Sequence, residues 1–209
     1  MQDIILVGAG GHAMSVVESV DPARQRICGF VDTEKTGYWL GIPILGREIQ
    51  EVPNYKKFHY LVAIGDVFRR KEYYQTIQRL GLRAANIIDP TALISPTVVM
   101  GAGNYVGKLA IINAGTTIGD NNLINTKALL EHNCRVESHT NISTNTTLNG
   151  DVVLEDGVFF GSCSVSNGQL RFGEFSVVGS GSIVIGDVEP YTTVVGAPAR
   201  AIKKNGRPV

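Results

Sequence analysis

The sequence predicts a small α/β domain followed by a parallel β-helix, and three observations indicate this fold class. Short apolar runs alternate with helical spacing as far as residue 88, and the first run ends in a glycine-rich turn. From residue 106 an aliphatic or aromatic side chain recurs at every sixth position. Neither an α-helix nor a flat strand has a period of six, whereas the short sides of a three-sided coil do.

The first 88 residues predict a Rossmann-like parallel sheet. Apolar runs at 4–7, 27–31 and 60–64 are expected to be strands. Residues 14–20 look like the start of an amphipathic helix, 69–80 have helical spacing, and Gly81 is suited to end the second helix. Strands that alternate with helices form a parallel sheet.

A glycine turn follows the first strand and opens the first helix. Its pattern, Gly8-x-Gly10-x-x-Ala13, allows backbone N–H groups to meet a phosphate. Asp32 ends the next strand, where such folds bind a ribose or sugar hydroxyl. His12 could donate to the phosphate or pack as an inert helix cap. Because the domain has only about half the length of a dinucleotide fold, a mononucleotide or nucleotide sugar is favoured over a nicotinamide cofactor.

The six-residue repeat occupies residues 92–195 and predicts a stack of coils. Each coil buries its apolar residues only against the coils above and below it, so the coils are stable only as a stack. It loses its apolar residue at Ser166, recovers at Phe172 and ends near Pro190; residues 196–209 form a C-terminal segment. The repeated positions are Val106, Ile112, Ile118, Ile124, Leu130, Val136, Ile142, Leu148, Leu154 and Phe160.

His132 is the candidate general base in the repeat. It lies two residues after Leu130, near a turn between flat sides, and Gly150 lies one coil of three hexads further on. Asn125 and Glu131 are expected to flank the same region. A histidine suits this role because its ordinary pKa is near 6.5 and a neighbouring carboxylate can fix its tautomer. The alternative is that His132 has no catalytic role and is simply one of the polar residues that an exposed corner of the coil requires.

Composition restricts the partners. The net charge is zero and the sequence pI is about 6.9, so no basic surface indicates nucleic acid or an anionic membrane. The start lacks the pattern of a signal peptide, and no run has transmembrane length. Three scattered cysteines suggest free thiols in a reducing cytoplasm, and no Cys/His spacing indicates a metal site.

Several motifs together resemble bacterial left-handed β-helix acetyltransferases of nucleotide sugars. They are Gly10-Gly11-His12, the strand ending at Asp32, Ala63-Ile64-Gly65, Ile94-Ser95-Pro96, Glu131-His132 and Gly196-Ala197-Pro198-Ala199. The group includes sialic-acid O-acetyltransferases and N-acetyltransferases of UDP-, dTDP- or GDP-linked 4-amino-4,6-dideoxy sugars. The resemblance implies a left-handed coil, a cytoplasmic homotrimer with acetyl-CoA between neighbouring β-helices, and a role in O-antigen or surface-polysaccharide biosynthesis.

The resemblance also implies roles for individual residues. His132 matches the base, Glu131 its orienting carboxylate, and Gly150 an amide facing the thioester oxygen. Many members have a second histidine where Asn141 aligns, and His139 lies two residues earlier. The implied substrate contacts are Gly10, Gly11, His12, Asp32, Gly65, Asn125, His139 and Asn141. The implied acetyl-CoA contacts are Gly150, Gly161, Gly179, Ala197 and Pro198; Gly161 and Gly179 could equally just turn corners.

The leading hypothesis is therefore acetyl transfer from acetyl-CoA to the amine of a nucleotide-linked 4-amino-4,6-dideoxy sugar. Because Cys134 is expected to point into the coil, it is a poor nucleophile candidate. O-acetylation of a sialic-acid-type sugar is the nearest alternative. A non-catalytic nucleotide-sugar sensor or trimeric scaffold is another, and a nicotinamide oxidoreductase is a distant one.

Overall fold

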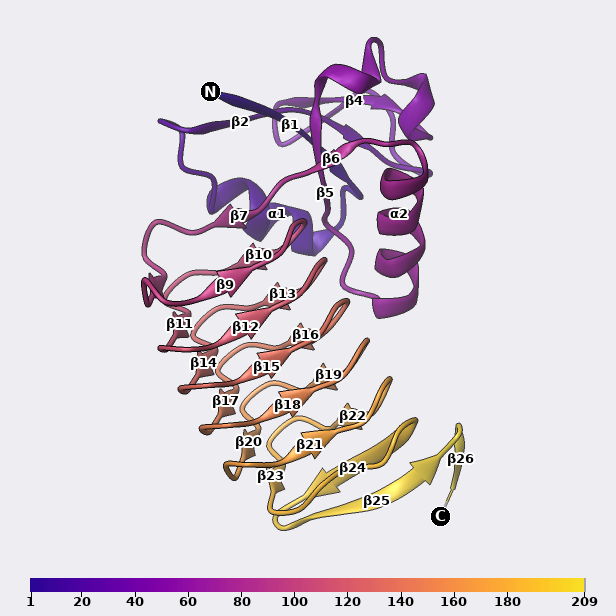
Figure 1. Cartoon of the computed structure of the whole chain (residues 1–209). Coiled ribbons are helices and arrows are strands. Elements are labelled where there is room, and N and C mark those ends of the chain that lie inside the picture. Colours follow the sequence, from indigo (N-terminus) through magenta and orange to yellow (C-terminus); the bar gives the residue numbers. More distant parts are fainter. Residues whose placement is uncertain (209) are drawn as a thin grey trace.

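A computed structural model describes residues 1–208 and shows two parts, an N-terminal α/β domain and a parallel β-helix (Figure 1). The sheet of the first part has the strand order β3-β4-β2-β1-β5-β6 and is parallel except for the β3–β4 hairpin. Its strands are β1 (Gln2–Val7), β2 (Gln25–Val31), β3 (Tyr38–Trp39), β4 (Ile42–Gly46), β5 (His59–Val62) and β6 (Arg83–Ala84).

Two helices cover this sheet, α1 (Gly11–Glu18) and α2 (Val67–Arg79), with short 3-10 turns η1 (Ile49–Glu51) and η2 (Tyr55–Lys57). α1 begins earlier than the expected 14–20, because the glycine turn itself supplies the N-cap at Gly10. α2 ends before Gly81, whose φ of +64° confirms the predicted glycine stop.

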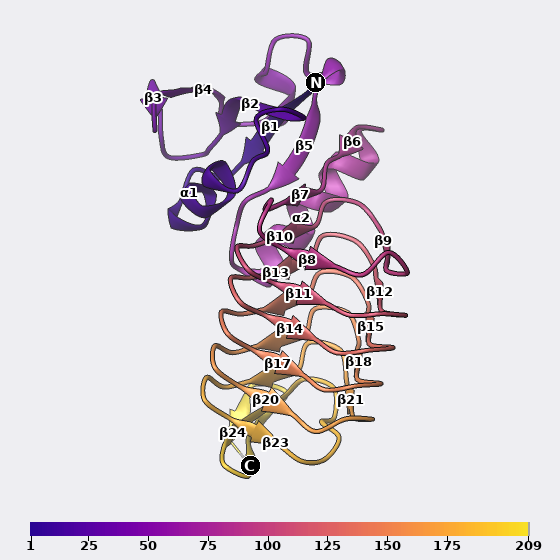
Figure 2. The same ribbon diagram turned by 90° about the vertical axis from the view of Figure 1, so that its left-hand side faces the viewer.

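The second part is a left-handed β-helix with three flat faces (Figure 2). We name them by chain order. The first face has β7 (Ile87–Ile88), β10 (Tyr105–Val106), β13 (Leu123–Ile124), β16 (Asn141–Ile142), β19 (Phe159–Phe160), β22 (Val177–Val178) and β24 (Thr192–Gly196). The second face has β8 (Leu93–Ile94), β11 (Ile111–Ile112), β14 (Leu129–Leu130), β17 (Thr147–Leu148), β20 (Val165–Ser166) and β23 (Ile183–Val184).

The third face has β9 (Val99–Met100), β12 (Thr117–Ile118), β15 (Arg135–Val136), β18 (Val153–Leu154) and β21 (Arg171–Phe172). An antiparallel extension, β25 (Ala199–Lys204) and β26 (Arg207–Pro208), continues the first face. Stacked strands pair in parallel at an offset of 18 residues, as in Leu129 with Thr147. The coil begins at β7, earlier than the repeat near Leu93 indicated, since β7 pairs with β10.

Each corner turns on a residue with positive φ, and these residues also recur every sixth position, from Gly103 to Gly181. Asn121, Asn133 and Asn145 occupy such places. Glycine and asparagine tolerate this backbone better than other residues. His139 (φ +65°) belongs to the same series, so its place in the sequence is a corner position.

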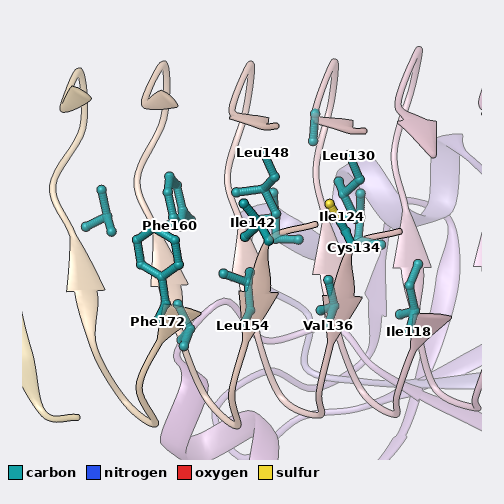
Figure 3. Packing of buried hydrophobic residues seen from close by; sticks show 14 of the residues in the cluster. Ile118, Ile124, Leu130, Cys134, Val136, Ile142, Leu148, Leu154, Phe160 and Phe172 are labelled. Carbon is teal, nitrogen blue, oxygen red and sulfur yellow. The ribbon is translucent and has the colours of Figure 1, made fainter. Parts of the chain in front are cut away.

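The predicted six-residue positions are buried and stack inside the coil (Figure 3). The interruption at Ser166 has a packing reason. Ser166 is fully buried in the coil that also contains Phe160 and Phe172, whose rings meet edge to face at 4.9 Å between centroids. The two large rings, one from the first face and one from the third, fill the interior of this coil. The inward residue of the second face, Ser166, must therefore be small.

The two parts pack closely. Tyr105 on the first face lies in one cluster with apolar residues of the sheet, and its hydroxyl is 3.1 Å from the Ser19 Oγ. α2 lies beside the corner between the third and first faces, while the second face is on the opposite side of the coil (Figure 1). No helix in the described part of the chain is both long and apolar enough to cross a membrane.

Candidate active site

A hollow of about 240 Å³ lies at the carboxyl ends of β1, β2 and β5, where parallel α/β sheets bind ligands. It brings together residues that the sequence predicted separately: Gly10, Gly11, His12, Asp32 and Gly65. Gly8, at φ +98°, makes the turn below them, and a Cβ there would lie 2.6 Å from Ile64. The N-termini of both helices therefore border one hollow, as binding of an anionic group requires.

Asp32 has a structural role, and the predicted contact with a ligand hydroxyl stays a prediction. Its carboxylate accepts hydrogen bonds from the backbone N–H groups of Ala9, Glu34 and Lys35, at 2.7, 3.0 and 2.9 Å. Burial would raise the pKa of Asp32, but these backbone donors outweigh it and lower the pKa. Asp32 thus holds the glycine turn against the loop after β2, and one lone pair at most remains for a ligand.

His12 lines the hollow but is mostly enclosed. Its ring meets Tyr105 edge-on at 5.0 Å, and its Nε2 is buried with no hydrogen-bond partner. Burial, with a further contribution from the charge of Arg70, lowers the pKa of His12 to about 4. The imidazole is therefore neutral near pH 7, and its contact with a bound ligand stays a prediction.

A second group of predicted residues lies at the corner between the second and third faces, which we call the His132 corner. The His132 side chain is 57% exposed, and its ring lies directly over Gly150 of the next coil. A Cβ on Gly150 would be 2.5 Å from both Cε1 and Nε2 of His132. Within residues 1–208 the N–H of Gly150 donates no hydrogen bond, so it can meet an oxygen at this corner.

In residues 1–208 neither of the residues predicted to flank His132 hydrogen-bonds to its ring. Glu131 instead accepts a hydrogen bond from Asn113 Nδ2 at 3.0 Å, since consecutive side chains diverge at the corner. The nearest carboxylate to His132 is Asp151, at 3.9 Å from Nδ1. Asn125 lies at the corner between the first and second faces, where its Oδ1 accepts from the N–H of Thr126. Sequence spacing identified the hexads but not the corner that each residue occupies.

The corner between the third and first faces, the His139 corner, is covered by α2. His139 is 8% exposed, its Nδ1 is 2.8 Å from Asn121 Nδ2, and its ring meets Tyr74 edge-on. Burial, followed by the charge of Lys71, lowers the pKa of His139 to about 4. Asn141, the first residue of β16, directs Nδ2 to the carbonyl of Gly65 at 3.4 Å, and Gly65 in turn lines the nucleotide-sized hollow.

Apart from Gly150, the predicted acetyl-CoA contacts lie in the C-terminal coils and the segment after them. Gly161 and Gly179 are at the corner between the first and second faces, where the next coil leaves a Cβ only 2.6 Å from Ser180 N and from Val195 Cγ1. Close packing thus accounts for both glycines, and their contact with acetyl-CoA stays a prediction. Ala197 and Pro198 form the turn between β24 and β25.

The structure adds two residues that the sequence reasoning missed, Arg69 and Arg70. Arg69 lines the hollow, and Arg70 lies beneath it with no exposed surface. The signal was present as three consecutive basic residues, 69–71, at the start of a helix. Cys134 is buried in the coil, as expected, and burial raises the pKa of its thiol to about 11. Nowhere in residues 1–208 do three His, Cys, Asp or Glu side chains gather suitably for a metal ion.

Fold and site together define a left-handed β-helix protein with an N-terminal α/β domain that has a nucleotide-sized hollow. Comparison with known proteins refines this. Residues 3–77 match the PglD N-terminal domain family. The perosamine N-acetyltransferase of Caulobacter crescentus, in complex with CoA and GDP-perosamine, is 28% identical over 96% of this chain and 97% of that chain, with a TM-score of 0.92.

A second structure gives the same result. The acetyltransferase domain of PglB from Neisseria gonorrhoeae, in complex with acetyl coenzyme A, is 26% identical over 96% of this chain and 98% of that chain, with a TM-score of 0.88. Among curated sequences, an Escherichia coli chloramphenicol acetyltransferase is 42% identical over 55 residues, which span 26% of each protein. An uncharacterised mimivirus protein is 34% identical over 103 residues, 49% of this chain and 20% of that protein.

The matched segments thus span only about a fifth to a quarter of these curated relatives, whereas the two solved structures match along nearly their whole length. In fold and along nearly its whole length, the chain is therefore similar to left-handed β-helix acetyltransferases that include a nucleotide-sugar enzyme, as the resemblance indicated.

Proposed function

We propose that the protein transfers an acetyl group from acetyl-CoA to the amine of a nucleotide-linked 4-amino-4,6-dideoxy sugar. The observation that carries this proposal is the contact of the His132 ring with Gly150, whose N–H has no other partner. An exposed base and a free amide donor on one corner are what acyl transfer from a thioester needs. The complexes of the Caulobacter and Neisseria proteins with CoA, acetyl-CoA and GDP-perosamine support this chemistry.

In the proposed reaction the neutral amine attacks the thioester carbonyl. His132 accepts the amine proton, a C–N bond forms, and the carbonyl oxygen takes the negative charge. The Gly150 N–H stabilises that oxyanion, a contribution that is about 3 kcal/mol in comparable sites. Collapse breaks the C–S bond and releases CoA thiolate, which takes up the proton. In place of the predicted Glu131, Asp151 would orient His132, since its carboxylate lies 3.9 Å from Nδ1.

The amino sugar would reach His132 of a neighbouring copy. Gly65 of the nucleotide-sized hollow accepts a hydrogen bond from Asn141 on the first face, whereas His132 lies at the corner between the second and third faces. Outward aliphatic residues on the second face support a homotrimer, because apolar patches on a surface mark protein–protein interfaces. They are the exposed Leu93 and Ile183 and the half-buried Ile111, Leu129 and Val165, with Thr147 between the last two.

The base of the nucleotide would point away from the β-helix. The hollow continues at Thr33 into a second one of about 270 Å³, lined by Arg47–Gln50 and by Tyr73 and Thr76 of α2. Since the sugar must face Asn141 and the β-helix, the base is left with this second hollow. Its volume is sufficient for a purine or a pyrimidine ring.

The test is a screen of UDP-, dTDP- and GDP-linked 4-amino-4,6-dideoxy sugars with acetyl-CoA. Release of free thiol is measured together with the product mass. The proposal expects one sugar to give a product that hydroxylamine does not cleave, because the new bond is an amide. A hydroxylamine-sensitive ester would instead establish O-acetylation. If a nucleotide sugar binds but no mixture of acetyl-CoA with a nucleotide sugar releases free thiol, the protein is a sensor or scaffold.

A further inference from the structure

The first residues of α2 have a charge distribution that opposes the helix dipole. Arg69, Arg70 and Lys71 follow one another at the N-terminal end, and the first turn contains no acidic residue. This end of a helix already has a partial positive charge, so cations here are unfavourable unless an anion is close. The N-cap, Asp66, accepts from the Arg69 N–H at 2.8 Å and is the local carboxylate. A departure from the local rule of this kind is expected at functional sites.

The three basic side chains have different surroundings. Arg69 is exposed and lines the hollow that also contains Gly10, Gly11 and His12. Lys71 points elsewhere, since its Nζ lies 4.8 Å from the centre of the Phe175 ring. Arg70 is fully buried between α2 and the β-helix. Of these three residues, Arg69 is the one that lines the hollow, whose wall also contains Lys35 and the carboxylates of Asp32 and Glu34.

Arg70 joins the wall of the hollow to the β-helix. Its Nη1 donates to the carbonyls of Ile64 and Gly65, at 3.3 and 3.1 Å. The Nε and Nη2 groups donate to carbonyls at the His139 corner, with distances of 3.2 Å to Asn121, 2.7 Å to His139 and 2.9 Å to Thr140.

No carboxylate lies within salt-bridge distance of this guanidinium in residues 1–208. Burial lowers the pKa of Arg70 to about 10, so it stays protonated at neutral pH. A buried cation satisfied only by neutral carbonyls keeps a net positive field around itself, and this field reaches the Gly65 edge of the hollow. The same field contributes to the lowered pKa of His12.

From this arrangement we propose that Arg69 and Arg70 form a diphosphate subsite at the Gly65 edge of the hollow. Arg69 contacts the phosphate oxygens. Arg70 is a positioning residue that fixes the Ile64–Gly65 wall relative to the β-helix and adds buried positive charge. The inference deepens the proposed function, on which it rests for the identity of the ligand as a nucleoside-diphosphate sugar.

The proposal is tested by titration calorimetry of the full-length protein with UDP, GDP, dTDP and inorganic pyrophosphate. Arg69→Gln is compared with Lys71→Gln, which removes the same charge two residues away but from a side chain that faces Phe175. We expect Arg69→Gln to weaken binding of the preferred diphosphate by about ten- to a hundredfold, the usual loss for a charge-assisted hydrogen bond. Lys71→Gln should change it by less than about threefold, and acetyl-CoA affinity should stay unchanged in both.

Arg70→Lys separates charge from positioning. Because lysine retains the charge but not the multiple carbonyl bonds, pyrophosphate affinity should stay within about threefold while KM for the nucleotide sugar rises about tenfold. Arg70→Gln should lose pyrophosphate binding as well. Equal KM values for wild type and Arg70→Lys would contradict the positioning role, because the carbonyl bonds of the guanidinium would then have no effect on sugar binding.

Equal losses of diphosphate affinity in Arg69→Gln and Lys71→Gln would show that only the overall positive charge matters and not the position of Arg69. A wild-type protein that binds none of the four anions would overturn the subsite. The proposed function fails separately: diphosphate binding that depends on Arg69, with no thiol release from any nucleotide sugar, would leave the subsite in place without the reaction.

Discussion

The His132 corner and the His139 corner are built from the same repeat, yet the two histidines have opposite environments. His132 is exposed over a glycine, whereas His139 is buried under α2 with its Nδ1 bonded to Asn121. The repeat places both side chains at corners, and the N-terminal domain covers only one of these. Whether a corner histidine is available for proton transfer thus depends on packing between domains, which the period of six does not encode.

The largest expected difference between the corners is in turnover. His132→Ala should lower kcat by roughly 10² to 10⁴, the usual contribution of a general base. His139→Asn, at a corner position that asparagine tolerates, should change kcat by less than about fivefold. Thiol release at saturating substrates measures both. A greater loss in His139→Asn than in His132→Ala would reverse the assignment.

The next effect concerns Gly150. A methyl group there would occupy the space of the His132 ring, so Gly150→Ala should displace the imidazole and lower kcat about ten- to a hundredfold. Gly186→Ala is the matched control, because a Cβ at Gly186 meets nothing within 4 Å. Similar kcat values for both variants and the wild type would show that the His132–Gly150 contact is not required.

The two buried histidines, His12 and His139, should make the stability of the protein depend on pH. The folded-state pKa values of His12 and His139 are about 4, below the ordinary 6.5, because burial disfavours the charged form. Between pH 4 and pH 6.5 the unfolded chain therefore binds more protons than the folded protein. The contribution of these histidines to stability is complete above about pH 6.5 and is lost as the pH falls toward 4.

Each histidine contributes a slope of up to about 1.4 kcal/mol per pH unit in that window. Urea unfolding from pH 7 to pH 4.5 measures this slope, and His139→Asn should make it shallower. A slope identical to that of the wild type would mean that His139 is protonated without cost in the folded protein.

The smallest effect lies inside the coil, away from both corners. Ser166 Oγ is buried without a hydrogen-bond partner. Ser166→Ala removes that polar atom and keeps the space for the Phe160 and Phe172 rings, so the free energy of unfolding should rise by about 1 kcal/mol. Thermal denaturation measures it. A lower melting temperature would imply that the hydroxyl has a partner.

The sequence alone predicted the fold well, since strand alternation, the glycine turn and the period of six are local patterns. It also predicted that Gly10, His12 and Asp32 gather near one turn, and that Gly150 lies one coil from His132. It did not show that Asp32 bonds to the backbone or that Glu131 turns toward Asn113. These outcomes depend on side-chain directions across elements distant in sequence.

Arg70 illustrates the same limit more strongly. Its carbonyl partners lie both in the loop before α2 and 51 to 70 positions away along the chain. No periodicity connects these segments, and a charged residue at such a place would normally be expected on the surface. The domain boundaries predicted at residues 88, 92 and 195 stay a prediction. The strand β7, which ends at residue 88, pairs with β10 of the β-helix.

The central claim is that the nucleotide-sized hollow of one copy works with His132 of another. Coexpression of two inactive variants tests it most directly. His132→Ala removes the base, and Gly11→Glu places a negative charge in the hollow, at a position where a Cβ meets nothing within 4 Å. In randomly mixed trimers about a quarter of the sites would combine an intact hollow with an intact His132, so acetyl transfer should return to about a quarter of the wild-type rate. Mixed oligomers that form but stay as inactive as either parent would contradict the account.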